Sequence, residues 1–465
     1  MKLDTIAAVS TGAAPGAIGI VRLSGPQAQE IARSIFQPAG DAVPALPPRY
    51  AVHGNVFDGT GNVDEGLALF FPAPHSYTGE DLVELHCHGN PLLLERVIDL
   101  ALAQGARLAQ PGEFTKRAFL NGRLDITQAE AVNELIRARS DAALRAALRQ
   151  LDGGLRRQVE PLRERLLELR TRIEASLDFP EEVPEPERVS QEIRHILKSA
   201  RRLASTHRAG RLLREGARMV IAGKVNVGKS SLLNALLRQE RAIVSERPGT
   251  TRDYIREMMD LQGTPVVVVD TAGIRPPGDE VEAEGVRSSE RLIEEADLLL
   301  AVLDSSQPLD EDDRRVLAIT AGRARVIVLN KWDLPGKCLR PDDCGLTRRT
   351  GGLAVNGLSD GPPTVAVSAL KGDGMEQLRR VLAEALQGQG DALAEGVAVN
   401  LRHYGLLRSV ENALERARGA VQQGLPLDQT ASDLREASER LGEITGEVFT
   451  DEIIERIFSS FCLGK

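Results

Sequence analysis

The strongest indication of the fold comes from residues 219–234, MVIAGKVNVGKSSLLN. The apolar run from Met219 to Ala222 predicts a short buried strand. Gly223 to Ser230 then fits the pattern G-x-x-x-x-G-K-S, and apolar residues recur at helical spacing after it. A strand, a glycine-rich loop and a helix in this order form the context that a phosphate-binding loop requires.

The backbone of this loop accounts for its expected affinity for phosphate. Glycines let the chain fold tightly so that N–H groups point at phosphate oxygens, and the N-terminus of the following helix adds partial positive charge. Lys229 is expected to reach the β- and γ-phosphates, and Ser230 to ligate Mg²⁺. The nucleotide contacts predicted in this loop are Asn226, Val227, Gly228, Lys229, Ser230 and Ser231.

Further polar segments follow the loop in a fixed order. Each of the last three comes after an apolar run that predicts a buried strand, and open α/β sheets bind ligands at the C-terminal ends of such strands. The segments are Pro248-Gly249-Thr250-Thr251-Arg252-Asp253, then Asp270-Thr271-Ala272-Gly273 after 266–269, Asn330-Lys331-Trp332-Asp333 after 326–329, and Ser368-Ala369-Leu370 after 364–367.

Residues 216–383, which contain all of these motifs, resemble the translation-factor-like class of small GTPases. The resemblance implies a guanine nucleotide. An ionised carboxylate only accepts hydrogen bonds, so Asp333 can take the two adjacent guanine donors that adenine lacks. A kinase or an ATPase shares the phosphate loop but does not need this base-reading motif. The other implied base contacts are Asn330 and Lys331, which brace the loop and the ring, and the backbone of Ser368, Ala369 and Leu370, which holds the exocyclic oxygen.

The same resemblance implies how a γ-phosphate is sensed. Thr251 is expected to close on Mg²⁺ only when that phosphate is present, and Asp270 to hold the metal through water. The Gly273 N–H is expected to sense the phosphate, with Thr271 and Ala272 completing the contacts. Ras-like enzymes place a water-positioning Gln directly after this motif. This chain has Ile274 there, which cannot orient water, so hydrolysis must recruit help from elsewhere.

The composition of the 465-residue chain is ordinary for a soluble protein, with 42% hydrophobic and 27% charged residues. Only 3% of the residues are aromatic, so base-stacking platforms are not expected, and the net charge of −9 argues against bulk nucleic-acid affinity. No apolar run reaches about 18 residues, so no membrane span is expected. Cys87, Cys338, Cys344 and Cys462 show no zinc spacing, which favours a reduced, cytoplasmic protein.

The pattern along the chain predicts an α+β domain over 1–120, helical segments over 121–215 and 384–465, and an α/β unit over 216–383. Helical stretches on both sides of the α/β unit indicate an insertion, because the termini of a domain often lie close together. The expected fold is therefore a small N-terminal sheet with helices on one face, a discontinuous helical domain, and an inserted Ras-like GTPase domain whose parallel sheet carries helices on both faces. Residues 336–363 are rich in Gly, Pro and Arg and predict a long loop.

Arginines are concentrated in the first helical segment. One explanation is solvated helix faces on which the arginines pair with glutamates; the other is a contact with an RNA backbone. The residues are Arg156, Arg157, Arg163, Arg165, Arg201, Arg202, Arg208 and Arg211.

The segments outside the GTPase unit sharpen the family assignment. Residues 111–122 read PGEFTKRAFLNG and continue into RLD and, at 128–131, QAEA; residues 19–25 read GIVRLSG, and the chain ends in FCLGK. With the GTPase insertion, these stretches resemble the MnmE (also called TrmE) family of tRNA-modification GTPases from end to end.

This family resemblance implies partners and cofactors. It implies that the N-terminal domain dimerises and binds 5-formyltetrahydrofolate as a one-carbon source. It implies a partner, MnmG, which supplies FAD and NADH chemistry in a heterotetramer. Together the two proteins add a carboxymethylaminomethyl or aminomethyl group at carbon 5 of the wobble uridine of certain tRNAs. The nucleotide domains of a homodimer meet across K⁺, and this activates GTP hydrolysis.

The resemblance also assigns residues to potassium and to hydrolysis. Asn226 matches the phosphate-loop Asn whose side chain binds K⁺, and Glu282 matches the catalytic acid that orders a bridging water in place of the missing Gln. An exposed carboxylate on a helix is the other explanation of Glu282. The family often has Thr in place of Ser245 and an apolar residue in place of Arg247, but the ligands there are largely backbone oxygens. The loop implied to wrap the ion and contact the nucleotide comprises Ser245, Glu246, Arg247, Pro248, Gly249 and Thr250; the metal ligands are Asn226, Ser230, Ser245, Arg247, Thr250 and Thr251.

For folate, the family contacts match Arg22, Glu84, Arg123 and Lys465. A carboxylate can accept from the pterin donors and cations can meet the glutamate tail, although Arg22 and Arg123 can also be ordinary surface cations. Cys462 is either a nucleophile or a packing residue. The run His86-Cys87-His88 looks like a metal site, but on a strand Cys87 faces away from the two histidines, so none is expected there.

A second function remains open at this stage. An RNA-bound GTPase switch in ribosome assembly would share the nucleotide site, but such proteins usually carry a basic RNA module, which the net charge of −9 does not suggest.

Overall fold

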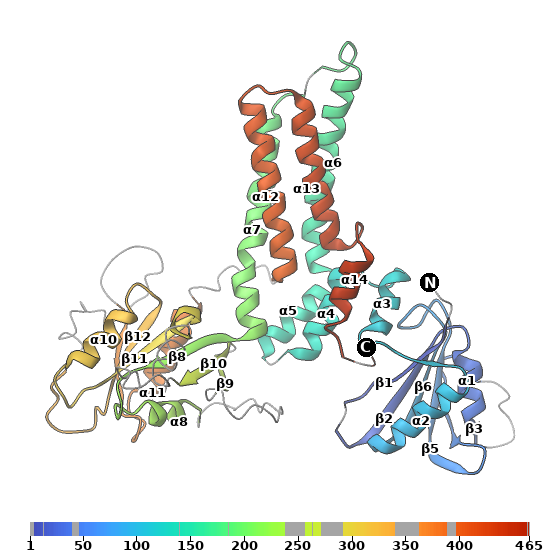
Figure 1. Cartoon of the computed structure of the whole chain (residues 1–465), viewed down its shortest axis with the longest axis horizontal. Coiled ribbons are helices and arrows are strands. Elements are labelled where there is room, and N and C mark those ends of the chain that lie inside the picture. The colour runs from blue at the N-terminus through green and yellow to red at the C-terminus, as the bar shows by residue number, and fades with distance from the viewer. Residues whose placement is uncertain are drawn as a thin grey trace, which may run out of the picture. The chain divides into compact units, whose positions relative to one another are not determined.

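The computed structural model of the chain is shown in Figure 1. It describes residues 4–12, 14–39, 46–138, 140–184, 186–237, 256–262, 264–270, 292–339, 362–387, 397–462 and 464, with the backbone alone at 256, 270 and 387. The chain forms two compact units. The first consists of Met1–Asn133, Gln150–Ile196 and Ser409–Lys465, and the second of Glu134–Arg149 and Leu197–Arg408.

A seven-stranded sheet in the order β3-β4-β5-β6-β2-β1-β7 builds the N-terminal part of the first unit. All neighbouring strands are antiparallel except β1 and β7. Helices α1 and α2 contact strands β2 and β6 as well as each other, so they cover the same face of the sheet, as predicted. The elements are β1 Ile6–Val9, β2 Gly16–Ser24, α1 Ala28–Ile35, β3 Phe36–Pro38, β4 Val52–Phe57, β5 Asn62–Phe71, β6 Leu82–Gly89, α2 Pro91–Ala103 and β7 Arg107–Leu108.

Helix α2 begins at Pro91, and the cause of this start is local. Asn90 is the N-cap residue, and its side-chain oxygen accepts hydrogen bonds from the backbone N–H groups of Leu92 at 2.9 Å and Leu93 at 3.5 Å. Proline fits the first helical position because the N–H that it lacks has no partner within the helix there.

Helices make up most of the remainder of the first unit. Helices α6 and α13, which lie on opposite sides of the α/β segment in sequence, pack side by side (Figure 1). The predicted discontinuous helical domain is therefore confirmed. A stripe on α6 is buried, comprising Leu162, Leu166, Leu169 and Ile173. The helices outside the α/β segment are α3 Glu113–Leu120, α4 Ile126–Arg137, α5 Asp141–Leu151, α6 Gly154–Asp178, α7 Val189–Glu215, α12 Leu401–Gln422, α13 Leu427–Thr445 and α14 Asp451–Phe458.

The C-terminal segment packs back onto the N-terminal sheet within the first unit. Phe458 and Phe461 share a core with Phe119 at the end of α3. Further on, Ser10 Oγ donates a hydrogen bond to the carbonyl oxygen of Gly464 at 3.1 Å. Gly464 has a φ of +87°, and a Cβ there would lie 2.0 Å from the carbonyl oxygen of Val9, so only glycine fits.

The second unit contains a six-stranded sheet in the order β13-β12-β11-β8-β10-β9. All neighbouring pairs are parallel except β9 and β10. Ile221 and Leu300 share a core with helices α8 and α11, whereas their neighbours Ala222 and Ala301 face the core beneath α10. Helices therefore cover both faces of this sheet, as predicted. The elements are β8 Ala217–Ala222, α8 Lys229–Leu237, β9 Arg256–Leu261, β10 Thr264–Asp270, β11 Leu298–Asp304, α10 Glu311–Ile319, β12 Arg325–Asn330, β13 Thr364–Ala366 and α11 Met375–Gln387.

Two further expectations concern membranes and metals. Within the described ranges, no helix is both long and apolar enough to cross a membrane. His86 and His88 alternate with Cys87 on β6, and Cys87 is buried in the core beneath the helices. The described part of the chain contains no cluster of His, Cys, Asp and Glu suited to a metal ion.

Candidate functional site

The candidate nucleotide site lies at the carboxyl ends of the parallel strands in the six-stranded sheet. The parallel pairs Ile221 with Asp270, and Asp304 with Asn330, bring the carboxyl ends of four strands to the same end of the sheet. The phosphate loop follows β8 there, and the segment containing Ser368 follows β13. Segments far apart in sequence therefore converge, as the rule for open α/β sheets predicts.

The phosphate loop is folded around its own lysine. Nζ of Lys229 donates hydrogen bonds to the carbonyl oxygens of Gly223 at 3.0 Å and Lys224 at 2.9 Å. Lys229 is 9% exposed, so its ammonium is held inside the loop. Asn226 has a φ of +62° and Gly228 a φ of +94°, which gives the tight turn that glycine-rich loops require.

The two glycines of the motif are in close contact with other strands. A Cβ on Gly223 would lie 2.6 Å from the carbonyl oxygen of Val302 in β11. A Cβ on Gly228 would lie 2.3 Å from Nδ2 of Asn330. Both positions therefore exclude any larger residue. The residues present fit a nucleoside phosphate.

Asn330 joins the phosphate loop to the base-reading segments. Its Nδ2 donates to the carbonyl oxygen of Val227 at 2.8 Å, and its Oδ1 accepts from the Ala369 N–H at 3.1 Å. The side chain is 2% exposed. The structure thus brings together three of the predicted segments through one amide group.

Two neighbours of Asp333 favour its ionised form. A hydrogen bond from the Ser368 side chain lowers the pKa of Asp333, and the Lys371 ammonium, 4.0 Å away, lowers it further. The Ser368 hydroxyl also accepts a hydrogen bond from the backbone N–H of Lys371 at 3.1 Å. A carboxylate that only accepts hydrogen bonds is what two adjacent guanine donors require.

Asp304 is a site residue that the sequence analysis missed. It ends β11, is 3% exposed in its side chain, and pairs through Oδ2 with Nζ of Lys331 at 2.6 Å. Burial raises its pKa, but hydrogen bonds from Lys331 and Ser306 outweigh this and lower the pKa. Because Asp304 also follows a buried apolar strand, the rule that located Asp270 and Asn330 would have located it.

Part of the predicted site lies outside the described residues. The side chain of Asp270 and the neighbouring Ile274 are among the positions not described. The predicted site residues outside the description are Ser245, Glu246, Arg247, Pro248, Gly249, Thr250, Thr251, Thr271, Ala272, Gly273, Glu282 and Lys465.

The residues matched to folate contacts are partly brought together. Arg22 on β2 and Glu84 on β6 are cross-strand neighbours, and Glu84 Oε1 accepts from Nε of Arg22 at 3.0 Å and from Nη2 at 2.7 Å. The Arg22 guanidinium also lies over the rings of Tyr77 at 5.4 Å and Phe114 at 5.7 Å. A hydrogen bond from His86 lowers the pKa of Glu84, and Arg22 lowers it further against the effect of burial.

Arg123 and Cys462 stand apart from this pair. Arg123 is exposed and lines a cavity of about 290 Å³ together with Asp125 and Arg156. Among the described contacts, none joins Arg123 to Arg22 or Glu84. Cys462 is exposed, and its carbonyl oxygen accepts a hydrogen bond from the Gly112 N–H at 3.3 Å, which is a structural role for the backbone.

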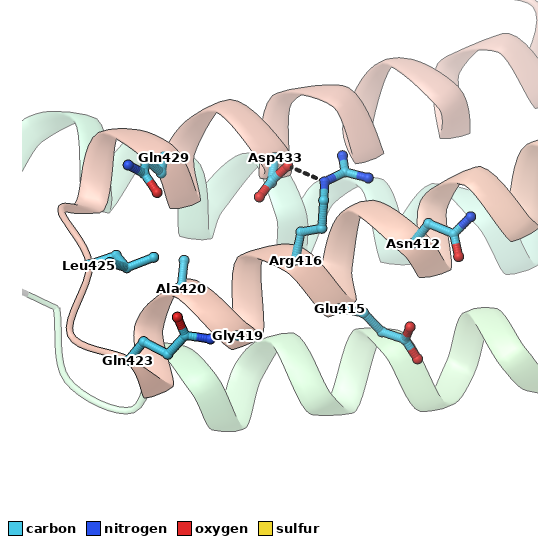
Figure 2. Close-up of a pocket in the computed structure, with 9 residues that line it drawn as sticks. All are labelled: Asn412, Glu415, Arg416, Gly419, Ala420, Gln423, Leu425, Gln429 and Asp433. Atoms are coloured by element: carbon cyan, nitrogen blue, oxygen red, sulfur yellow. Dashed lines mark hydrogen bonds and ion pairs between the residues drawn. The ribbon is translucent and has the colours of Figure 1, made fainter.

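Figure 2 shows a larger cavity, of about 810 Å³, between α12 and α13. Arg416 crosses it to meet Asp433 at 2.9 Å, and the guanidinium also pairs with Glu436 at 2.6 Å. The cavity contains none of the predicted site residues, and its principal cation is neutralised by the two carboxylates. It therefore offers no charge for a phosphate.

Several arginines of the first helical segment also pair with acids. Arg163 meets Glu447 at 2.5 Å and Glu160 at 3.3 Å, and Arg211 pairs with Asp297. These pairs favour the explanation that the arginine-rich faces are balanced by acidic partners.

Known proteins are similar to this chain along almost its entire length. Residues 5–123 match the family described as GTP-binding protein TrmE N-terminus, and residues 126–462 match the MnmE helical domain. The tRNA modification GTPase MnmE of Aquifex aeolicus is 44% identical over 470 residues, covering 99% of this chain and 100% of its own. The protein of the same name from Moorella thermoacetica is 46% identical over 470 residues, covering 99% of each chain. Among solved structures, the G domain of the T. maritima FeoB iron transporter is 23% identical, covers 37% of this chain and 99% of its own, and has a TM-score of 0.27.

The phosphate loop, the amide bridge from Asn330 and the end-to-end similarity to these relatives lead to one conclusion: the chain belongs to the MnmE family of tRNA modification GTPases.

Proposed function

We propose that this chain is a potassium-activated GTPase that works with MnmG to modify carbon 5 of the wobble uridine in certain tRNAs. The observation that carries the GTPase part is the bridge made by Asn330. One buried amide holds both the phosphate loop at Val227 and the base-reading segment at Ala369, which fixes the spacing between the phosphate and guanine subsites.

The predicted site residues have defined tasks in this proposal. Lys229 and the loop N–H groups bind the β- and γ-phosphates, and Ser230 is the Mg²⁺ ligand. Asp333, whose ionised form is favoured by a hydrogen bond from Ser368, selects guanine. Thr251 and Asp270 complete the magnesium site, and Gly273 senses the γ-phosphate.

Potassium is proposed because the phosphate loop contains a suitable ligand, Asn226, and because Ile274 occupies the position of the usual water-positioning Gln. Bound beside the β- and γ-phosphates, K⁺ would supply the positive charge that an arginine finger supplies in other GTPases. Asn226 adopts a φ of +62° at the turn of the loop, a conformation that Asn tolerates better than most residues. Glu282 orders the attacking water in place of the side chain that Ile274 does not provide. The remaining proposed ligands are Ser245, Arg247, Thr250 and Thr251.

The N-terminal sheet is proposed to bind 5-formyltetrahydrofolate in a homodimer. The ionised Glu84 can accept hydrogen bonds from pterin donors, and Arg22, Arg123 and Lys465 can meet the carboxylates of the glutamate tail. The reaction on tRNA is proposed to require MnmG, which contributes FAD chemistry within a heterotetramer in the cytoplasm. The free thiols of Cys87, Cys338 and Cys462 are compatible with that reducing compartment.

The rate of GTP hydrolysis in KCl and in NaCl at equal ionic strength tests the proposal. We expect fast turnover in potassium and a large loss in sodium, with the dimeric state followed in parallel. Glu282→Ala should abolish hydrolysis and leave GTP binding intact. Equal rates in the two salts would refute potassium activation.

The competing function is an RNA-bound GTPase switch in ribosome assembly. Analysis of tRNA from a deletion strain separates the two, because loss of the modified wobble uridine is expected only for the modification enzyme. Fully modified wobble uridines in that strain would favour the switch.

A further inference from the structure

A second lysine in the phosphate loop is anchored outside the nucleotide site. Nζ of Lys224 lies 2.7 Å from Oδ2 of Asp310 and 2.8 Å from Oδ2 of Asp313. The Lys224 side chain is 13% exposed and that of Asp313 is 3% exposed, so the ion pair is largely shielded from water. Shielding makes such a pair stronger and makes the loss of one partner more costly.

The start of helix α10 fixes both carboxylates. Oδ1 of Asp310 accepts from the Asp313 N–H at 2.9 Å, and Oδ2 of Asp313 accepts from the Asp310 N–H at 3.3 Å. This capping box orients each carboxylate through a backbone hydrogen bond that does not involve Lys224. The hydrogen bond from Lys224 lowers the pKa of Asp310 to about 2, whereas burial raises the pKa of Asp313.

The backbone of Lys224 acts on the lysine that binds phosphate. Its carbonyl oxygen, like that of Gly223, accepts a hydrogen bond from Nζ of Lys229. The side chain of Lys224 is fastened to α10, and its carbonyl faces Lys229. The orientation of this peptide group therefore depends on the ion pair with Asp310 and Asp313.

We infer that Lys224, Asp310 and Asp313 form a positioning element that holds the phosphate loop ready for the β-phosphate of a guanine nucleotide. Lys224 does not touch the nucleotide in this arrangement; it sets the carbonyl that directs Lys229. The inference rests on guanine-nucleotide binding by this chain. It adds residues to the site that neither the motif nor the family similarity assigns.

The test must distinguish a loss of fold stability from a loss of phosphate-loop positioning. Lys224→Met alone confuses the two, because it leaves Asp313 buried beside Asp310 without a cation. The double variant Lys224→Met/Asp313→Asn removes that buried charge and keeps Asp310 as the helix cap. Lys224→Arg keeps the charge. Arg218→Met is the matched control, since Arg218 makes an exposed ion pair with Glu295 at 2.5 Å in the same domain.

The experiment measures the affinity of the full-length protein for a fluorescent GDP analogue, the competition by GMP, and the melting temperature. We expect Lys224→Met to weaken GDP binding about tenfold, since a misdirected ammonium loses part of a charge-assisted hydrogen bond. GMP, which has no β-phosphate, should compete as it does with the wild-type protein. Lys224→Arg should restore most of the GDP affinity, and Arg218→Met should leave it unchanged.

The double variant decides whether weak GDP binding comes from a misplaced phosphate loop or from a less stable fold. Positioning predicts that Lys224→Met/Asp313→Asn regains the melting temperature but keeps the weak GDP affinity. Recovery of both together, an equal loss for GMP, or GDP affinity of Lys224→Met within about twofold of wild type would overturn the inference. A wild-type protein that binds no GDP would instead refute the nucleotide-binding function itself.

Discussion

The amide of Asn330 donates to the carbonyl oxygen of Val227 at 2.8 Å, across a sequence separation of 103 residues. Its other end accepts from the Ala369 N–H at 3.1 Å. The phosphate loop and the base-reading segments are thus tied by one side chain. A buried carbonyl group that loses such a donor is left without a hydrogen bond and without water, which costs free energy. Substituting Asn330 therefore measures how much the hydrogen bond contributes.

Asn330→Ala should weaken GDP binding by at least about tenfold, because it removes both hydrogen bonds and leaves the Val227 carbonyl unpaired. Asn330→Asp is the matched variant, since it keeps an acceptor for Ala369 but loses the donor to Val227. Titration with a fluorescent GDP analogue measures both. Wild-type affinity in Asn330→Asp would show that the bond to Val227 contributes little.

Gly228→Ala should abolish nucleotide binding. The backbone there has a φ of +94°, and the new Cβ would lie 2.3 Å from Nδ2 of Asn330. Gly336→Ala is the control, because its φ of +79° is similar but no atom of the described residues lies within 4 Å of the added carbon. Equilibrium dialysis with GTP compares the two variants, and similar affinities would contradict the steric explanation.

Asp333→Asn should exchange guanine for xanthine selectivity. The amide offers one acceptor and one donor in place of two acceptors, which suits the oxygen that xanthine carries where guanine carries its amino group. We expect GDP affinity to fall about a hundredfold and xanthosine diphosphate to bind better than GDP. Competition binding with the two diphosphates is the measurement. An unchanged preference for GDP would mean that another group reads the base.

Low pH should reduce the stability of the N-terminal domain, because it protonates the carboxylates that pair with Arg117. This guanidinium is 4% exposed and bonds to Asp4 at 2.7 Å, Glu80 at 2.9 Å and Glu113 at 3.1 Å. Burial raises the pKa values of Asp4 and Glu113, but hydrogen bonds from Arg107 and Arg117 outweigh it and lower both. A lowered folded-state pKa adds stability above the unfolded value, near pH 4, that is lost as the pH falls further.

Arg117→Met tests this pH dependence. Removing one partner of a buried ion network should destabilise the fold by about 3–5 kcal/mol at pH 7. The difference from wild type should shrink toward pH 3, where the carboxylates become protonated. Urea unfolding at both pH values measures it, and a difference that does not change with pH would contradict the assignment.

Leu441→Ala should destabilise the helical domain by about 2–5 kcal/mol, because Leu441 on α13 is 0% exposed. Leu167→Ala on α6 is the control: its side chain is 45% exposed, so truncation should have little effect. Thermal unfolding compares the two variants. Equal losses of stability would show that the α6–α13 packing does not hold the domain together.

Local patterns were enough to predict the phosphate loop and the segment that contains Asn330, because each has a strong signal in adjacent residues. The α/β order of 216–383 and the interrupted helical domain followed from alternation along the chain. Strand β11 and its terminal Asp304 were missed, although their signal was of the same kind.

Pairs set by tertiary contact could not be read from spacing. Lys224 and Asp310 lie 86 residues apart, and their meeting depends on how α10 docks beside the sheet. Arg22 and Glu84 were named only through family resemblance, since the register that opposes them is fixed by the neighbouring strands. Long-range register and helix docking therefore mark the limit of inference from this sequence.

The packing of α6 against α13 sets an order of events during synthesis. The ribosome makes α6 and then the entire α/β segment before α13 emerges. During this interval the nascent α6 lacks the helix that later packs against it. The helical domain must therefore close after the inserted segment has been made, and the apolar stripe of α6 stays uncovered by α13 until then.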